Sequence, residues 1–245
     1  PLMFSCDNND PEIVKFLLNS GCRVDVKDGY GSDILHHAAK FCRNTAVADA
    51  VVNVMADINI KDSQNQTPLF LACVYSNLTV AQILLNSKKC DLNLQDEEGN
   101  TPLHKAVFNK NAALVTALLK NSCNVNILNK KHETPLILAD KRRNTETMLL
   151  LLTYSSDINT DIVNDNGWSV LNFAIKENNT IIIDKLFDIG CNVNLQTNKG
   201  ISPLMTACTS GNLDVVKRLL DAGSAFDTVD QDGCIALFYA AQLNN

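Results

Sequence analysis

Residues 101–106 read Thr-Pro-Leu-His-Lys-Ala, and this stretch decides the fold because copies of it recur along the whole chain. Copies and looser variants begin at seven positions, namely Asp33, Thr67, Thr101, Thr134, Ser169, Ser202 and Ile235. Successive starts are 34, 34, 33, 35, 33 and 33 residues apart. A motif that returns at a nearly constant spacing indicates stacked structural repeats, whose core runs from one repeat into the next.

The copy at Thr101 shows how one repeat is built. Thr101 can cap a helix, and Pro102 suits the first helical position, where no backbone N–H is needed. Leu103 and Ala106 give a short first helix an apolar face, and residues 114–119 give a second helix the same kind of face. The chain then turns into a hairpin-like finger that leads to the next copy.

The residues near each finger tip support this register. Residues that tolerate a positive φ lie two positions before every motif start: Gly31, Asn65, Gly99, His132, Gly167, Gly200 and Gly233. The predicted turn therefore recurs in step with the motif.

A period of about 33 residues that carries T-P-L-H-x-A resembles the ankyrin repeat family over the whole chain. The resemblance implies an all-α solenoid of helix-turn-helix repeats joined by β-hairpin fingers. It predicts a single ankyrin-repeat domain over residues 1–245. The predicted repeats are 1–32 (partial), 33–66, 67–100, 101–133, 134–168, 169–201, 202–234 and 235–245 (partial).

Composition and charge narrow the function classes. The chain has 245 residues and a formal net charge of −6 at pH 7, spread along the repeats. A sequence-independent nucleic-acid binder needs clustered basic charge, so nucleic acid is not the expected partner. No apolar run approaches the ~20 residues that a membrane-spanning helix needs. We therefore expect no membrane span in this sequence.

Seven of the nine cysteines fall at equivalent places in the repeats, which argues against disulfides. Three lie on predicted first helices (Cys6, Cys73 and Cys208) and four lie just after second helices (Cys22, Cys90, Cys123 and Cys191). Equivalent positions in stacked helices are ~8–10 Å apart, whereas a disulfide needs Cα atoms within about 7 Å. The pattern predicts reduced thiols in a cytoplasmic or nuclear protein.

The histidines and the catalytic motifs give no indication of an enzyme. His36 and His104 occupy the histidine of T-P-L-H, whose imidazole in this family bonds neighbouring backbone groups. His37 and His132 have no Cys or carboxylate at a ligand spacing. Since C-x-x-C, H-E-x-x-H, G-x-S-x-G and phosphate-cradling loops are all missing, we expect no catalysis, no cofactor and no metal.

The resemblance also implies where a partner binds. In ankyrin domains, partners usually contact the finger tips and the exposed face of the first helices, which together line a concave groove. Five aromatic residues fall at those register positions: Tyr30, Phe41, Tyr75, Phe108 and Trp168. Aromatic side chains are enriched among binding anchors. The alternative is that some of them pack beneath the neighbouring finger.

Charged residues lie beside these aromatic positions. Basic residues gather in the fifth repeat and its finger: Lys130, Lys131, Lys141, Arg142 and Arg143. The neighbouring finger carries Glu97 and Glu98. The basic residues either form a solvated face or favour a partner with acidic residues next to apolar ones, oriented by the acidic finger.

A modification is implied by the resemblance as well. Ankyrin hairpins often carry an Asn that an asparaginyl hydroxylase modifies, with a Leu eight residues earlier. Four asparagines match this pattern: Asn93, Asn126, Asn159 and Asn194, after Leu85, Leu118, Leu151 and Leu186. The alternative role is a hydrogen-bonding residue of the hairpin.

The function that the resemblance favours is a protein–protein interaction module, an adaptor or scaffold that binds a protein or peptide in the groove. Three alternatives stay open. The chain could be the cytoplasmic domain of a membrane channel, a pathogen effector that captures host proteins, or the targeting domain of an enzyme whose catalytic part lies elsewhere.

The second repeat departs most from the pattern, because residues 46–52 place Ala and Val where other second helices have Leu. We therefore expect it to be the least stable internal repeat.

The two ends of the sequence predict an incomplete stack. The chain opens at Pro1 inside a motif and closes on Ile235, Leu237 and Phe238, a first helix with no second helix to cover it. Solenoids need terminal repeats with a polar outer face. We expect that the protein continues beyond Asn245, or that a partner or a second copy covers this end.

Overall fold

The computed structural model describes residues 2–242; residue 1 and residues 243–245, which belong to the two partial terminal repeats, lie outside the described part. Over residues 2–242 the chain forms fifteen helices and no strand. The helices form two compact units, which divide the chain between Lys130 and Lys131. The prediction of one domain stays a prediction, and each unit is described by itself.

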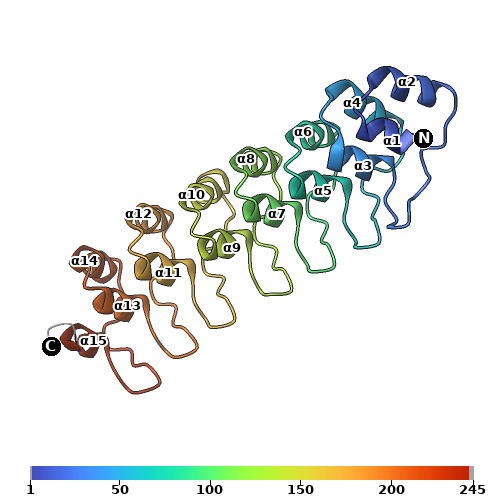
Figure 1. The fold of residues 1–245 in the computed structure, drawn as a ribbon. Coiled ribbons are helices and arrows are strands. Elements are labelled where there is room, and N and C mark those ends of the chain that lie inside the picture. The colour runs from blue at the N-terminus through green and yellow to red at the C-terminus, as the bar shows by residue number, and fades with distance from the viewer. Residues whose placement is uncertain (1, 243–245) are drawn as a thin grey trace. The chain divides into compact units, whose positions relative to one another are not determined.

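The first unit consists of four helix pairs. Its helices are α1 (Leu2–Asp7), α2 (Pro11–Asn19), α3 (Ile34–Phe41), α4 (Thr45–Val54), α5 (Pro68–Val74), α6 (Leu78–Asn86), α7 (Pro102–Phe108) and α8 (Ala112–Lys120). The first helices α1, α3, α5 and α7 pack in sequence order, and so do the second helices α2, α4, α6 and α8 (Figure 1). The unit therefore has two layers of helices, with the fingers extending beyond the layer of first helices.

The second unit repeats this arrangement. Its helices are α9 (Pro135–Lys141), α10 (Thr145–Tyr154), α11 (Val170–Lys176), α12 (Thr180–Ile189), α13 (Pro203–Ser210), α14 (Leu213–Asp221) and α15 (Ala236–Gln242). The first helices α9, α11, α13 and α15 again pack in order, and α10 packs on α12. The apolar side of α15 is open to solvent, since Leu237 is 72% and Phe238 is 49% exposed.

Each first helix from α3 to α15 begins one residue after a predicted motif start. The residue at the motif start caps the helix through a side-chain oxygen that accepts backbone N–H groups: Asp33, Thr67, Thr101, Thr134, Ser169 and Ser202. Proline fills the first position of α5, α7, α9 and α13, as expected.

Asparagine caps six of the seven second helices, and Asp10 caps the remaining one, α2. The caps of α4, α6, α8, α10, α12 and α14 are Asn44, Asn77, Asn111, Asn144, Asn179 and Asn212. The buried Asn77 also donates from Nδ2 to the carbonyls of Ala38, Ala39 and Cys42 at 3.2, 3.0 and 2.6 Å. One side chain thus caps its own helix and the carboxyl end of the helix in the preceding repeat.

The fingers are tight loops rather than paired strands. In the second finger, Asp62 N donates to Gln66 O and Asn65 N donates to Asp62 O, both at 3.1 Å. Gly99, with φ of 75°, shows why the third finger needs a glycine: a Cβ there would lie 2.9 Å from the backbone nitrogen of Lys130 in the next finger. Neighbouring fingers are therefore in backbone contact.

The cap of α3 differs chemically from the other first-helix caps. Asp33 is fully buried, and its Oδ1 accepts from the backbone N–H groups of Leu35 and His36 at 2.9 and 3.1 Å. Its Oδ2 is buried and has no hydrogen-bond partner among the described residues. A threonine, as at Thr101, would cap the helix without this second oxygen. The second repeat therefore carries a polar atom that is costly to bury.

Replacing Asp33 by Thr should stabilise the protein. The substitution removes the unpartnered oxygen and keeps a capping hydroxyl, so we expect the free energy of unfolding to rise by about 1–3 kcal/mol. Urea denaturation followed by circular dichroism measures the change. The converse substitution Thr101→Asp serves as the control and should lower the free energy of unfolding. An unchanged urea midpoint for Asp33→Thr would contradict this explanation.

Hydrogen exchange should identify the second repeat as the least protected internal repeat. Helix α4 buries Val47, Ala48, Val51 and Val52, whereas α8 in the same unit buries three leucines and a valine within residues 114–119. Because less apolar surface is removed from water in α4, its amides should exchange faster than those of α8. Equal protection of the two helices would show that the second repeat compensates elsewhere.

Candidate functional site

Exposed aromatic side chains mark one face of the first unit. Tyr30, on the first finger, is 75% exposed, and Phe41, Tyr75 and Phe108 are each 46% exposed. The last three lie at the carboxyl ends of α3, α5 and α7. The expected exposure of these four residues is confirmed. We call the surface made by the finger tips and the exposed side of the first helices the inner face of each unit.

Two of these rings contact each other along the inner face. The ring centroids of Phe41 and Tyr75 are 6.4 Å apart, and those of His37 and Phe41 are 6.1 Å apart. Such separations are typical of paired aromatic rings. The inner face of the first unit therefore carries a continuous row of rings across two repeats.

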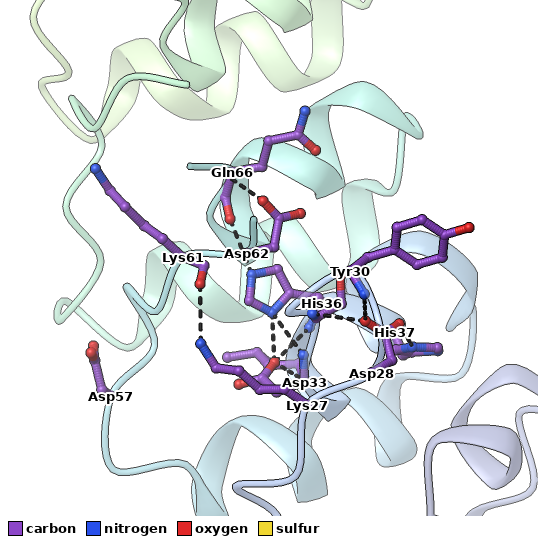
Figure 2. Close-up of polar contacts among 12 residues, drawn as sticks. Lys27, Asp28, Tyr30, Asp33, His36, His37, Asp57, Lys61, Asp62 and Gln66 are labelled. Atoms are coloured by element: carbon purple, nitrogen blue, oxygen red, sulfur yellow. Dashed lines mark hydrogen bonds and ion pairs between the residues drawn. The ribbon is translucent and has the colours of Figure 1, made fainter. Parts of the chain in front are cut away.

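Two histidines contact carboxylates of other repeats in the fold. His37 lies between Asp7 and Asp28, with Nδ1 3.2 Å from the first carboxylate and Nε2 3.1 Å from the second (Figure 2). His132 contacts Asp165 at 2.7 Å. The sequence spacing does not reveal these carboxylate partners, because stacking brings together residues from different repeats.

Asp28 uses its two oxygens to hold the first finger in place. One oxygen accepts from the backbone N–H groups of Tyr30 and Ser32 at 2.8 and 2.9 Å, and the other contacts His37. Burial opposes ionisation, but the hydrogen bonds from His37 and the two amides outweigh it, so the pKa of Asp28 lies below its usual value. The finger tip that carries Tyr30 is thus fixed to α3.

The first two fingers are also linked to each other, as Figure 2 shows. Lys27 Nζ donates to the carbonyl of Lys61 at 3.3 Å, and His36 Nε2 lies 3.1 Å from the carbonyl of Gln66. The backbone N–H of Ser63 donates to the carbonyl of Tyr30 at 3.0 Å. His36 therefore has the structural role expected of it, and Tyr30 projects from a finger that its neighbour supports.

Trp168 lies on the inner face of the second unit and is half-buried, so its expected exposure is only partly met. Its ring packs on Phe173 with centroids 5.0 Å apart, and Lys176 Nζ lies 5.0 Å from the ring centroid. Trp168 and Lys176 line a cavity of about 300 Å³ together with Ile201, Thr206, Thr209 and Ser210.

The basic residues predicted as a patch are exposed, but acidic side chains neutralise two of them. Lys130 ends the first unit, and the other four belong to the second. Lys141 Nζ lies 2.7 Å from Glu133, and Arg143 lies 3.1 Å from Glu177. Two of the five basic residues are therefore paired with acidic side chains of the same unit.

The asparagines proposed for hydroxylation hold neighbouring repeats together. Asn93 Oδ1 accepts from the backbone N–H of Asn124, and Asn194 Oδ1 accepts from that of Ala225, both at 2.8 Å. This confirms the hydrogen-bonding alternative for these two residues and leaves their hydroxylation a prediction.

Asn159 is out of register with the other asparagines, because its finger contains two additional residues. Its Oδ1 accepts from the backbone N–H of Asp161 two residues later at 2.9 Å, as Asn192 Oδ1 does from Asn194. Asp161 instead takes the position between repeats and accepts from the backbone N–H of Asn192 at 3.2 Å. The hydroxylation of Asn159, like that of the other three asparagines, stays a prediction.

The cysteines are thiols and most are shielded from reaction. All nine lie within residues 2–242, and none forms a disulfide there. Burial raises the pKa of Cys6 and Cys90 to about 12 and that of Cys191 to about 11. Since the thiolate is the reactive form, these three are not nucleophiles at neutral pH.

Neither a metal site nor a membrane-spanning segment is found in the described residues. No three His, Cys, Asp or Glu side chains of residues 2–242 lie together in a way that could hold a metal ion. None of the helices there has more than ten residues, and none could cross a bilayer.

Asp140 is a half-buried acid at a position that other repeats fill with apolar residues. The equivalent residues, all buried, are Ala39, Cys73, Val107, Ile175 and Cys208. Burial, together with the nearby charge of Glu177, raises the pKa of Asp140 to about 7, although Arg143 opposes the shift. A small polar cavity that these three residues line lies at the junction of α9 with α10 and α11.

Comparisons with known proteins agree with the fold. The family model described as "Ankyrin repeats (3 copies)" matches residues 2–96, 42–129, 84–164, 103–197 and 171–245. No curated protein sequence matches the chain. Among solved structures, the ankyrin repeat domain of Bcl-3, a member of the IkappaB protein family, matches with a TM-score of 0.65 at 21% identity and covers 100% of this chain and 98% of its own. At that identity the likeness shows the fold alone.

The raised pKa of Asp140 predicts a pH-dependent stability. Between about pH 4 and pH 7 the folded protein keeps a proton on Asp140 that the unfolded chain releases, so the free energy of unfolding should fall as the pH rises. Asp140→Asn removes this dependence and should raise the free energy of unfolding at pH 8 by on the order of 2 kcal/mol, and by clearly less at pH 5, where only part of the dependence has developed. Urea titrations at the two pH values measure this difference, and an equal effect at both would contradict the prediction.

Proposed function

Because the chain belongs to the ankyrin repeat family, we propose that it is a non-catalytic interaction module that binds a protein or peptide on the inner faces of its repeats. The observation that carries the proposal is the exposed row of aromatic side chains in the first unit. Phe41 and Tyr75 are nearly half exposed, although each helix that bears them buries a complete apolar face elsewhere. Core packing does not require these rings.

Preorganisation of the aromatic row supports binding. Phe41 and Tyr75 lie at helix ends that are capped and packed on both sides by neighbouring repeats. A ring that is already fixed loses little conformational freedom when a partner covers it, so more of the apolar burial contributes to affinity. Tyr30, on its supported finger, extends the same face and adds a hydroxyl that can bond a partner.

The charges around the row favour recognition of a partner with both apolar and polar side chains. The exposed Glu97 and Glu98 lie on the third finger of the first unit. Exposed charges at the rim of an interface act mainly on the rate of association and on orientation. We propose an adaptor or scaffold role in the cytoplasm or nucleus, in agreement with the thiol chemistry of the cysteines.

Removal of two rings should abolish partner binding without unfolding the chain. The wild type, Phe41→Ala/Tyr75→Ala and the control Tyr154→Ala are immobilised and exposed to the same cell extract, and bound proteins are quantified by mass spectrometry. Tyr154, the last residue of second helix α10, is 51% exposed, close to the 46% of Tyr75. Each anchor ring that is lost should weaken binding at least about tenfold.

The proposal requires that proteins retained by the wild type and by Tyr154→Ala are depleted on the double variant. Circular dichroism and thermal melting verify that all three proteins are folded. Retention of the same set of proteins on all three would contradict binding through the aromatic row.

A further inference from the structure

We infer that the cavity between Trp168 and Lys176 in the second unit is a binding pocket for an acidic side chain of the partner. The inference rests on the proposed function and specifies the chemistry of one contact. The ligand that fits is the carboxylate of a Glu or Asp in a peptide segment, with its aliphatic stem on the tryptophan ring.

In the fifth repeat, the lysine at the equivalent position is paired with a carboxylate of the protein itself. Lys141 lies seven residues after the motif start, and Glu133 lies one residue before it. Their side chains meet at 2.7 Å, so the lysine is neutralised within its own repeat. The register thus brings these two positions together on the inner face.

The sixth repeat keeps the lysine but lacks the carboxylate. Lys176 is equivalent to Lys141, and Trp168 takes the place of Glu133. The exposed ammonium group of Lys176 lies over the Trp168 ring, with 5.0 Å between Nζ and the centroid. The adjacent Glu177 is 3.1 Å from Arg143, and none of the ion pairs among residues 2–242 involves Lys176. A carboxylate from outside would restore the pair that the fifth repeat makes internally.

The remaining walls of the pocket select for a carboxylate on an apolar stem. Thr206, Thr209 and Ser210 donate their hydroxyl protons to carbonyls of their own helix at 3.1, 2.9 and 2.8 Å. Among the described residues that line the cavity, Lys176 is therefore the cationic donor, while Trp168 and Ile201 provide apolar surface. A phosphate group is usually bound by several donors or by a bidentate arginine, so one lysine suits a carboxylate better.

The position of Trp168 makes occupancy directly measurable. It is the single tryptophan of the chain, so a change in its fluorescence reports on this pocket alone. A carboxylate that reaches Lys176 would draw the ammonium group from the ring and place new atoms against the indole. Both events change the surroundings of the indole and hence its emission.

The test uses a random peptide library displayed on phage and selected on the whole chain. Peptides enriched on the wild type should contain Asp or Glu beside apolar residues, and they should shift the fluorescence of Trp168. Replacing the acidic residue of an enriched peptide by its amide should weaken its binding about tenfold, as expected for the loss of a charge-assisted contact. Lys176→Glu should lose these peptides and enrich ones that carry Lys or Arg.

Lys217→Glu is the matched control, because Lys217 is an exposed lysine on second helix α14 and undergoes the same change of charge. It should retain the peptides selected on the wild type. Enriched peptides without acidic residues, or acidic peptides that bind Lys176→Glu as well as the wild type, would overturn the inference and leave the proposed function standing. If the wild type enriches no peptide, both fail.

Discussion

The shortness of the helices is the constraint on which the rest of the structure depends. The helices have six to ten residues, so most of their backbone groups lie at an end and lack a partner within the helix. Thr101 and its equivalents satisfy the amino ends of the first helices, and an asparagine satisfies those of the second. Asn77 reaches back to three carbonyls of the preceding repeat. A repeat is therefore complete only when its neighbour is present, which is why single repeats cannot fold and stacked ones can.

The residues that cap the helices and form the core are not those of the inner face, so the inner face is available for binding. Apolar burial and capping use the motif start, the helix faces that meet between layers, and the turn before the second helix. The residues at the carboxyl ends of the first helices are not needed for either task, so Phe41 and Tyr75 can remain exposed on a rigid support. The fingers are fixed by backbone contacts such as Ser63 to Tyr30 and by the side chains of Lys27 and Asp28, while the side chain of Tyr30 remains exposed. Recognition surfaces on such a frame can change without loss of the fold.

The sequence predicts those features that depend on neighbours along the chain. Capping residues, the proline positions and the exposure of Phe41 follow from a local motif and its period. Contacts that form only when repeats stack cannot be predicted in this way. For example, His37 contacts Asp7, which lies thirty residues earlier in the sequence. Asn159 shows a second effect that the motif does not reveal: its finger has two additional residues, and Asp161 makes the contact to the next repeat. The asparagine caps could have been recognised, since Asn77 and Asn111 both lie ten residues after a motif start. Because asparagine is common throughout the chain, its presence at this position does not by itself indicate a helix cap.

Three repeats carry a lysine seven residues after the motif start and differ in the residue just before the motif, so the same frame presents different chemistry in each of the three. In the second repeat the pair is Ser32 and Lys40, whose side chains are 3.5 Å apart. In the fifth it is the ion pair of Glu133 and Lys141, and in the sixth it is the ring of Trp168 beneath Lys176. The lysine is kept while its companion changes from a hydroxyl to a carboxylate to an indole. Since the companion determines how much of the lysine's charge is compensated inside the protein, it also determines how much is available to a partner. Substitution at a single position per repeat is then enough to alter the electrostatic pattern of the inner face, and the capped core beneath it need not change.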